Sequence, residues 1–515
     1  MTGTISSVGD GSSGEEGKGN KADEGNNQHH QQQQKQNFMT MVKKAVSERP
    51  AEPPSICEVP KDLIEGNKGA YTPKVVGIGL LLDDSWRTST SMVRLERYKW
   101  CCVRKLIMGR HPDPASWSRE VHEPLLGKCF DLMVGLVPQI RASYSSVSSD
   151  TSSEDVAIKM LLDSCFVLHR LLKHAGKGKG NNDYDDDDWN QQLGRCWVWG
   201  TVRRDLLLLS NQVPFFVLQA LFKQLGNDRG AGDILVNCGL QLLSSLRPGR
   251  LHNAPIICGD VHHLLHLFYL SIDLPPRDWE PSKTKTREIR SHLSHPPVKR
   301  RPPNSKPAHD SISRELLPVP EAELTWWVPC AKELEEAGVR IRACKYGAKS
   351  FLDVRFRRRR GILEIPPLEL FDYSVPLFRN LIAFEQTYPS TAGRITAYAI
   401  FMDCLLKTPQ DVRLLHQSGV LLNHMNGQRG ETATGFFSSL CAEAHTSADR
   451  NYLAGVMDQV LKYQKRKWPR WRAALVSGYF TNPWVTTSVI AAVILLTMTV
   501  LQSFYAVYGY YKPSK

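Results

Sequence analysis

The sequence predicts a mainly helical body with a small β-hairpin and one transmembrane helix near the C-terminus. Three observations lead to this prediction. Apolar residues recur at helical spacing through most of residues 51–475, two alternating segments flank an arginine-rich turn, and residues 484–511 contain no charged side chain. The chain has 515 residues, of which 42% are hydrophobic, so it is long enough to bury a large core.

The first 50 residues are predicted to form a disordered polar tail. Residues 1–37 consist largely of Gly, Ser, Glu, Asn, Gln and Lys, without an apolar run. Such a segment buries too little surface to offset the entropy lost on ordering. A secretory signal peptide needs an apolar stretch, so we expect none here.

The cysteines predict a reducing compartment. There are twelve of them and no Cys-x-x-Cys pair, and Cys165, Cys404 and Cys441 lie within apolar helical runs. Buried free thiols are therefore favoured over a disulfide or zinc framework. The chain also contains no Asn-x-Ser/Thr glycosylation acceptor with a non-proline middle residue, which agrees with a body outside the secretory lumen.

An amphipathic helix is predicted from Ser153, which we assign as its N-cap. Residues on one side of the helix are apolar, as expected for a helix packed on a core. The apolar side comprises Val156, Met160, Leu161, Cys165, Leu168 and Leu172, and the polar stripe comprises Asp155, Lys159, Asp163, Arg170 and Lys173.

The densely apolar segment 203–225 is predicted to be central core, with Asn211 capping a new helix and Pro214 in its first turn. Asp260 is assigned as a further N-cap, and Gly338 as a left-handed helix end with Leu334 against Val339. The segments FLDVRF and GILEIPPLEL alternate around the turn 357–360, which predicts the β-hairpin. Other helices are expected at 92–108, 233–246, 260–269, 376–388, 395–406, 411–417, 434–444 and 449–463.

Two low-complexity inserts interrupt the predicted body of residues 51–475. Residues 176–190 form an acidic loop, whose run Asp185 to Asp188 is more typical of a solvated loop than of a cation site. Residues 275–320 are rich in Pro, Lys and Arg and predict a flexible basic linker.

Residues 485–508 are predicted to span a membrane. A helix of about 20 residues crosses a bilayer core of roughly 30 Å, and aromatic residues mark both ends of this segment. Basic residues are concentrated upstream, so the positive-inside rule places the body in the cytoplasm, as in a tail-anchored protein. The predicted anchor residues are Trp484, Val489, Ile490, Val493, Ile494, Leu495, Leu496, Val500, Leu501, Phe504 and Tyr505. The juxtamembrane basic residues are Lys462, Lys465, Arg466, Lys467, Arg470 and Arg472.

Several segments, in order, resemble the plant domain-of-unknown-function 247 family. They include CEVPKDL, AYTPKVVGIG, LLDSCFVLHRLL, RRDLLLLSNQVPFFVLQALF, AKELEEAGVRI, LEIPPLEL, FRNLIAFEQTYP and YFTNPW. The resemblance runs from about Ile56 to Tyr511. It implies a mainly helical, single-pass plant membrane protein without an established enzymatic activity, and some relatives act in pollen self-incompatibility recognition. The chain departs from the family at GIGLLLDDSW, where Gly-Pro-Tyr-His-His-Gly is common, and at Ser210, where Glu is usual.

No specific catalytic motif is found: there is no nucleophile elbow, Walker loop, His-Glu-x-x-His or kinase signature. His262 and His266 have a spacing that could bind zinc, but no neighbouring ligand completes the site. Cys165 and His169 could imitate a nucleophile and its base, although a packed thiol is favoured. Glu385 and Asp403 lie in apolar helices, where a carboxylate can be catalytic, but partnered structural or edge positions are favoured. Trp326 and Trp327 could form a binding platform, although core or packing roles are favoured.

The sequence therefore predicts a membrane-tethered, non-enzymatic interaction or recognition protein. Its predicted partners are the lipid bilayer and an unknown protein, with no cofactor, no metal and no nucleic acid. Two alternatives stay open: an unrecognised hydrolase or metalloenzyme, and a body that binds lipid or nucleic acid through the basic linker.

Overall fold

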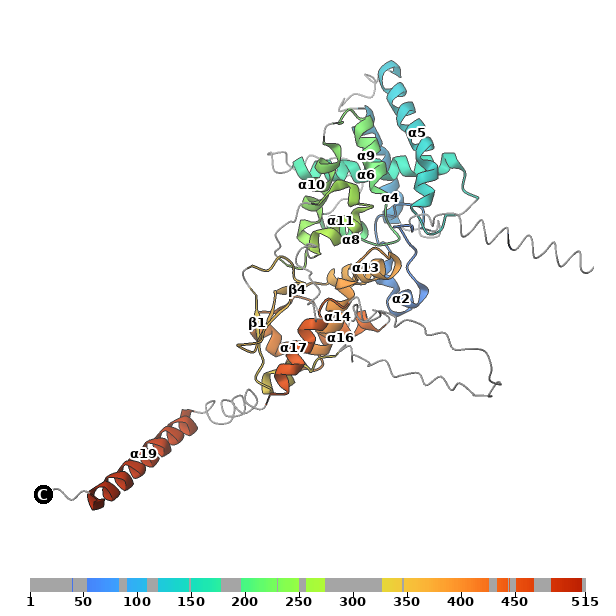
Figure 1. Cartoon of the computed structure of the whole chain (residues 1–515). Helices are drawn as coiled ribbons and strands as arrows, with labels where there is room; N and C mark the ends of the chain where they lie inside the picture. The colour runs from blue at the N-terminus through green and yellow to red at the C-terminus, as the bar shows by residue number, and fades with distance from the viewer. Residues whose placement is uncertain are drawn as a thin grey trace, which may run out of the picture. The chain divides into compact units, whose positions relative to one another are not determined.

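The computed structural model describes residues 39, 53–82, 90–108, 119–147, 150–176, 196–228, 230–249, 256–273, 327–344, 347–425, 433–442, 444, 451–466 and 483–511 (Figure 1). The chain divides into Met1–Pro53 and Pro54–Lys515, and the second unit contains almost all described residues. The predicted tail, acidic loop and basic linker lie almost entirely outside these ranges. The predicted domain boundaries therefore stay predictions.

The predicted mainly helical fold is confirmed. The helices of the first half of the body are drawn blue to green in Figure 1, and most of them lie together around α6, which packs against α4, α5, α9 and α10. α6 is central because one side of it is almost continuously apolar and buried. These helices are α2 (Lys61–Gly66), α3 (Lys68–Tyr71), α4 (Thr90–Val103), α5 (Arg119–Ala142), α6 (Ser153–Gly176), α8 (Cys196–Asp205), α9 (Phe215–Gln224), α10 (Ala231–Leu243) and α11 (Leu264–Ile272), with short turns η2 (Arg104–Met108), η6 (Ser244–Leu246) and η7 (Cys258–Asp260).

The yellow-to-red elements form the second half of the body in Figure 1. They share one hydrophobic core with the first half. Helix α13 joins the halves, since Asn380 Oδ1 accepts a hydrogen bond from Leu209 N at 2.9 Å and Asn380 Nδ2 donates to Ala70 O at 3.0 Å. The helices of this half are α12 (Ala331–Glu336), α13 (Ser374–Thr387), α14 (Arg394–Leu405), α15 (Pro409–Gln417), α16 (Ala433–Cys441) and α17 (Ala454–Gln464). The last described helix, α19 (Pro483–Tyr511), contributes no residue to this core.

The predicted hairpin is confirmed and belongs to a larger sheet. Strand β2 (Arg355–Arg357) pairs antiparallel with β3 (Ile362–Ile365), and β1 (Arg340–Ala343) pairs parallel with β3 on its other side. A second parallel pair joins β4 (Leu368–Leu370) to β5 (Leu421–Asn423). The strands β1 and β5 were not predicted, because segments of three or four residues carry little alternation signal. Leu368–Leu370 was predicted as part of the second hairpin strand, but it forms the separate strand β4 after Pro366 and Pro367.

Three predicted helix caps are wrong. Helix α6 is capped by Ser152 and not by Ser153, since Ser152 Oγ accepts a hydrogen bond from Asp155 N at 3.0 Å. Helix α11 begins after His263, whose side chain accepts from His266 N, so Asp260 does not cap it. Asn211 lies before the start of α9 and binds other backbone groups, and Pro214 itself is the N-cap of α9.

The helix end predicted at Gly338 is confirmed. Gly338 has a φ of 86°, and Val339 N donates to Leu334 O at 2.8 Å, which is the longer hydrogen bond of a left-handed helix end. Helix α5 was not predicted. It contains Pro124 and Pro138, which normally interrupt helices, and packing against α6 and α9 stabilises it despite them.

A pocket above a buried polar network

A loop in the first half of the body is held by buried side chains rather than by secondary structure. Asp205, at the end of α8, accepts hydrogen bonds from three successive backbone N–H groups, those of Lys74, Val75 and Val76, at 2.7 to 3.1 Å. Three N–H donors on one carboxylate oxygen form an anchor for the loop. Burial raises the pKa of Asp205, while Arg204 and these donors oppose the rise.

Asn211 fixes the next part of the loop. Its Oδ1 accepts from Ile78 N at 2.7 Å, and its Nδ2 donates to Val76 O and Asp205 O. Gly79 completes the turn with a φ of +80°, and a Cβ there would overlap Gln212 O, so only glycine fits. The segment RRDLLLLSNQ therefore serves to hold residues 74–79 in place.

A buried ion pair closes the network. Lys99 Nζ, on α4, lies 2.6 Å from Asp163 Oδ1, on α6, and the two side chains are 2% and 1% exposed. Lys99 also donates to Gly77 O at 2.7 Å and to Glu96 Oε1 at 2.8 Å, and Asp163 Oδ2 accepts from Gly79 N at 2.9 Å. Burial lowers the pKa of Lys99, but Asp163 and Glu96 outweigh it, so the pKa lies above its ordinary value.

A pocket of about 760 Å³ lies over this ion pair. That volume is typical of sites for small ligands or a short peptide segment. The wall combines apolar side chains with charged ones, and acidic residues outnumber basic ones. The apolar lining includes Val75, Leu80, Leu81, Leu82, Leu95, Val147, Val156, Ile158 and Leu162, and the charged lining consists of Glu58, Glu96, Lys99, Asp150, Asp155, Lys159 and Asp163.

This site was not predicted from the sequence, and the polar stripe predicted on α6 is partly wrong. Asp163 and Arg170 are buried and do not belong to a solvated face. The spacing of residues in α6 does indicate that Asp163 is buried. Asp163 follows Met160 by three residues and precedes Val167 by four, so helical periodicity places it on the apolar side. The partner, Lys99, is 64 positions upstream (163 − 99) and has no comparable signal.

The histidine pair predicted as a weak zinc candidate is packed against aromatic residues. The rings of His262 and His266 stack with centroids 4.9 Å apart, and His262 Nε2 lies 2.8 Å from Tyr388 Oη. His266 Nδ1 accepts from His262 N. Within the described residues, no group of three or more His, Cys, Asp or Glu side chains could hold a metal ion.

The remaining candidates are structural. Cys165 is fully buried, and burial raises the pKa of its thiol well above the ordinary value. His169 Nδ1 lies 3.5 Å from Tyr98 Oη and 3.6 Å from Cys102 Sγ. Asp403 pairs with Lys407 at 2.6 Å near the surface. Trp327 is 56% exposed, so it is not a packing residue, and Trp326 lies outside the described residues.

Glu385 is a partnered structural carboxylate, as predicted. It accepts hydrogen bonds from Tyr269 Oη, Ile395 N, Thr396 N and Thr396 Oγ1, at 2.6 to 2.9 Å. Burial raises its pKa, and these four donors counteract the rise. The side chain thereby joins α11, α13 and α14.

The predicted anchor residues lie on one uninterrupted helix, α19. Residues Thr487–Tyr508 are long and apolar enough to cross a membrane, and none of this stretch is buried. Hydroxyls bond back to the helix, with Ser488 Oγ donating to Trp484 O and Thr497 Oγ1 to Val493 O. Lys462, Lys465 and Arg466 lie at the end of α17, whereas Lys467, Arg470 and Arg472 fall outside the described residues.

Comparison with known proteins identifies similar plant sequences. The family model DUF247, described as a plant protein of unknown function, matches residues 56–498. The UPF0481 protein At3g47200 of Arabidopsis thaliana is 26% identical to this chain, and the aligned region covers 89% of this chain and 87% of the length of that relative. The putative UPF0481 protein At3g02645, also of Arabidopsis thaliana, is 23% identical, covering 88% and 90%. No solved structure matches the chain.

Proposed function

Because this chain belongs to DUF247, a plant family of unknown function, we propose that it is a membrane-tethered recognition protein that binds a basic segment of a partner protein. In this proposal α19 anchors the chain in a bilayer, and the pocket over Lys99 and Asp163 receives the partner segment.

The observation that carries the proposal is the exposed apolar helix. Its 22-residue stretch, Thr487–Tyr508, is about 33 Å long at 1.5 Å per residue, which matches a bilayer core. Exposed apolar side chains such as Leu495 and Leu496, at 68% and 67%, are stable in lipid and costly in water. Trp484 and Tyr505 lie near the two ends, where aromatic residues favour the interface.

The orientation follows from the flanking charges. Lys462, Lys465 and Arg466 precede the helix at the end of α17, and a basic flank stays in the cytoplasm under the positive-inside rule. The body, with its pocket, is then cytoplasmic. Free thiols such as those of Cys129 and Cys165 agree with this reducing compartment.

The pocket lining supports a ligand with both basic and apolar groups. The pocket lining contains five carboxylates and two ammonium groups beside apolar side chains. The lining therefore attracts positive charge and can cover aliphatic surface of a ligand. A peptide segment with Lys or Arg beside Leu, Ile or Val has this chemistry.

Binding is better supported than catalysis. Lys99 is the buried amine of the pocket, and all three of its donors have acceptors. An ammonium held in this way, with a raised pKa, cannot attack a substrate or accept a proton. The ion pair therefore shapes the pocket floor.

Topology is tested by fusing a fluorescent protein to the N-terminus of the full chain and treating intact membranes with protease. We expect a membrane signal that protease added from the cytoplasmic side removes. Protection of the fluorescent protein until detergent is added would contradict the orientation.

Recognition is tested with immobilised dodecapeptides that have the same apolar residues and carry either two Lys or two Glu. We expect the immobilised basic peptides to retain the full chain in detergent. The variant Ile158→Arg should be retained about tenfold more weakly, because it places a positive charge at the pocket. Ile234→Arg is the matched control, since the two isoleucines are 42% and 41% exposed and only Ile158 lines the pocket. Equal retention of both peptide sets, or equal effects of both variants, would contradict the proposal.

A further inference from the structure

One face of the β1-β3-β2 sheet carries a concentration of arginines. In the register, Arg340 and Arg357 flank Ile362, and Arg342 and Arg355 flank Glu364. Residues two apart in a strand share a face, so these four arginines lie on the same side, and all four are exposed. Arg358, Arg359 and Arg360 extend them through the exposed turn between β2 and β3. We call these seven arginines the arginine face.

The arginine face is only partly neutralised. Arg355 pairs with Asp353, and Arg357 pairs with Glu364 at 2.7 Å. No described carboxylate lies within ion-pair distance of Arg358, Arg359 or Arg360. Seven arginines and two paired carboxylates leave a net charge of about +5 on this sheet and its turn, and folding of the sheet does not require such an excess.

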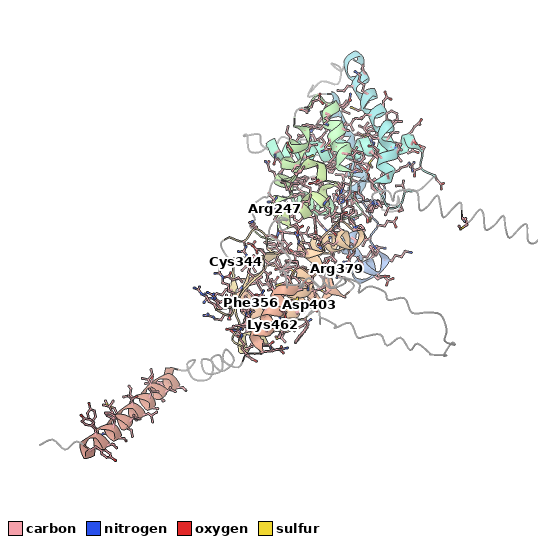
Figure 2. The ribbon with its side chains drawn as sticks, viewed as in Figure 1. Arg247, Cys344, Phe356, Arg379, Asp403 and Lys462 are labelled. Carbon is pink, nitrogen blue, oxygen red and sulfur yellow. The ribbon has the colours of Figure 1, made fainter. Side chains whose placement is uncertain are left out.

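The opposite face of the same sheet packs onto α17, the last described helix before α19. The rings of Phe356 and Tyr463 meet edge to face with centroids 5.6 Å apart, and the Arg466 guanidinium lies 5.8 Å from the Tyr463 ring centroid. Gly361 ends the arginine turn directly against Tyr463. Figure 2 labels Phe356 and Lys462 in this part of the body. Lys462, Lys465 and Arg466 therefore lie at the end of the helix that packs against the other side of the arginine-bearing sheet.

The chain connects α17 to the apolar helix. Residues 467–482 join α17 to α19, and an extended chain of that length spans at most roughly 55 Å. The connection therefore keeps the end of α17 within roughly 55 Å of the start of α19, so the arginine-bearing sheet is within reach of any bilayer that α19 crosses. A surface tethered in this way has a high effective concentration at the bilayer, so weak individual contacts suffice.

We propose that the arginine face docks on the anionic lipid headgroups of the membrane that α19 spans. This inference rests on the proposed anchoring. Planar guanidinium groups match phosphate oxygens, and a basic residue near an anionic surface contributes within a Debye length of about 8 Å. The charge complementarity and the chain connection to α19 favour lipid over an acidic protein or a nucleic acid, neither of which is tethered to the chain.

The experiment uses the full chain reconstituted in vesicles of phosphatidylcholine alone or with 30% phosphatidylserine. An arginine-selective dicarbonyl reagent and mass spectrometry report the reactivity of each arginine. We expect Arg340, Arg342 and Arg358 to react several-fold more slowly in the anionic vesicles and to recover in about 0.5 M salt, where screening is strong. Arg97, exposed on α4, is the internal control and should react equally in both.

The variant Arg358→Gln/Arg359→Gln/Arg360→Gln removes three charges from the exposed turn. Docking should weaken by up to about 100-fold, so Arg340 and Arg342 should react in anionic vesicles as they do in neutral ones. The charge-matched control Lys61→Gln/Lys68→Gln/Lys128→Gln removes three exposed lysines from the other half of the body and should leave their protection unchanged.

Vesicle flotation separates this inference from the proposed anchoring. Failure of the wild-type chain to float with neutral vesicles would overturn the anchoring itself. Flotation with both vesicle types, but equal arginine reactivity in both, would overturn the docking alone. Protection by polyuridylic acid in neutral vesicles, without protection by phosphatidylserine, would assign the arginine face to nucleic acid and also overturn the docking.

Discussion

The ammonium group of Lys99 lies 2.6 Å from the carboxylate of Asp163, and neither side chain is more than 2% exposed. Each charge has further hydrogen bonds to the loop of residues 77–79. A buried charge is stable only when it is paired and its remaining donors or acceptors are satisfied. This pair therefore fixes the floor of the pocket and the path of the loop above it.

Replacing Lys99 by Met should destabilise the body by about 3–5 kcal/mol, because Asp163 would keep a buried charge without its partner. The double variant Lys99→Met/Asp163→Leu should recover most of this loss, since it removes both charges. Thermal unfolding of the full chain in detergent gives the comparison. The exposed pair Lys462–Asp458 is the control, and Lys462→Met should change stability by less than about 1 kcal/mol. Similar effects of the two single variants would show that Lys99 is not buried as an ion.

Glu385→Gln should destabilise the joint between α11, α13 and α14. The carboxylate accepts four hydrogen bonds, and an amide nitrogen in place of one oxygen would face donors. A loss of about 2–4 kcal/mol is expected, since buried donors would be left unsatisfied. Urea unfolding followed by tryptophan fluorescence measures it. Asp403→Asn, at a surface pair, is the control; an equal loss there would contradict the special role of Glu385.

Acid should weaken the folded body through its buried histidines. Burial and then His262 lower the pKa of His266 from 6.5 to about 3, and burial and then His266 hold the pKa of His263 well below its ordinary value. The unfolded chain therefore binds protons near pH 6.5 that the folded chain does not bind. Stability should fall as pH decreases below about 6.5, by up to about 2.7 kcal/mol per pH unit for two histidines, and the loss should continue toward pH 3.

Melting temperatures measured from pH 7.5 to pH 4.5 test this dependence. The variant His263→Asn/His266→Phe keeps a residue that can cap α11 and removes both titrating rings, so its stability should depend less on pH. An identical pH profile in the two proteins would assign the acid sensitivity to other groups.

Gly361→Ala should detach α17 from the sheet. Gly361 has a φ of +61°, and a Cβ there would overlap the ring and hydroxyl of Tyr463. Gly347→Ala is the matched control, because Gly347 has a φ of +77° and no atom within 4 Å of an added Cβ. We expect about 1 kcal/mol from backbone strain at either position and a further loss only at Gly361. Hydrogen exchange of α17 amides measures the difference, and equal exchange in both variants would contradict the packing.

The parts of the fold that sequence predicted are those with a local period. The spacing of Val156, Met160 and Leu168 gave α6, and alternation around the arginine turn gave the β2–β3 hairpin. The pairing of Leu368 with Leu421 could not be predicted from the sequence, because a parallel pair joins distant segments and leaves no local pattern.

The candidate site was likewise only partly within reach of sequence-based prediction. Helical spacing would have placed Asp163 on the buried side of α6, yet its partner Lys99 and the loop N–H groups come from elsewhere in the chain. Asn211 was interpreted as a helix cap because its short amide commonly fills that role, and here the same amide binds the loop backbone. Partners fixed only by tertiary structure cannot be inferred from one sequence.

Alkaline carbonate extraction of membranes from plant cells that express the full chain tests the anchoring by α19. The wild-type chain should stay in the membrane pellet. The variant Val493→Lys/Leu496→Lys should be released, because each lysine at the centre of a spanning helix costs about 3 kcal/mol, whereas Val493→Leu/Leu496→Val should stay in the pellet. Recovery of the wild-type chain in the carbonate supernatant would show that α19 does not anchor the chain.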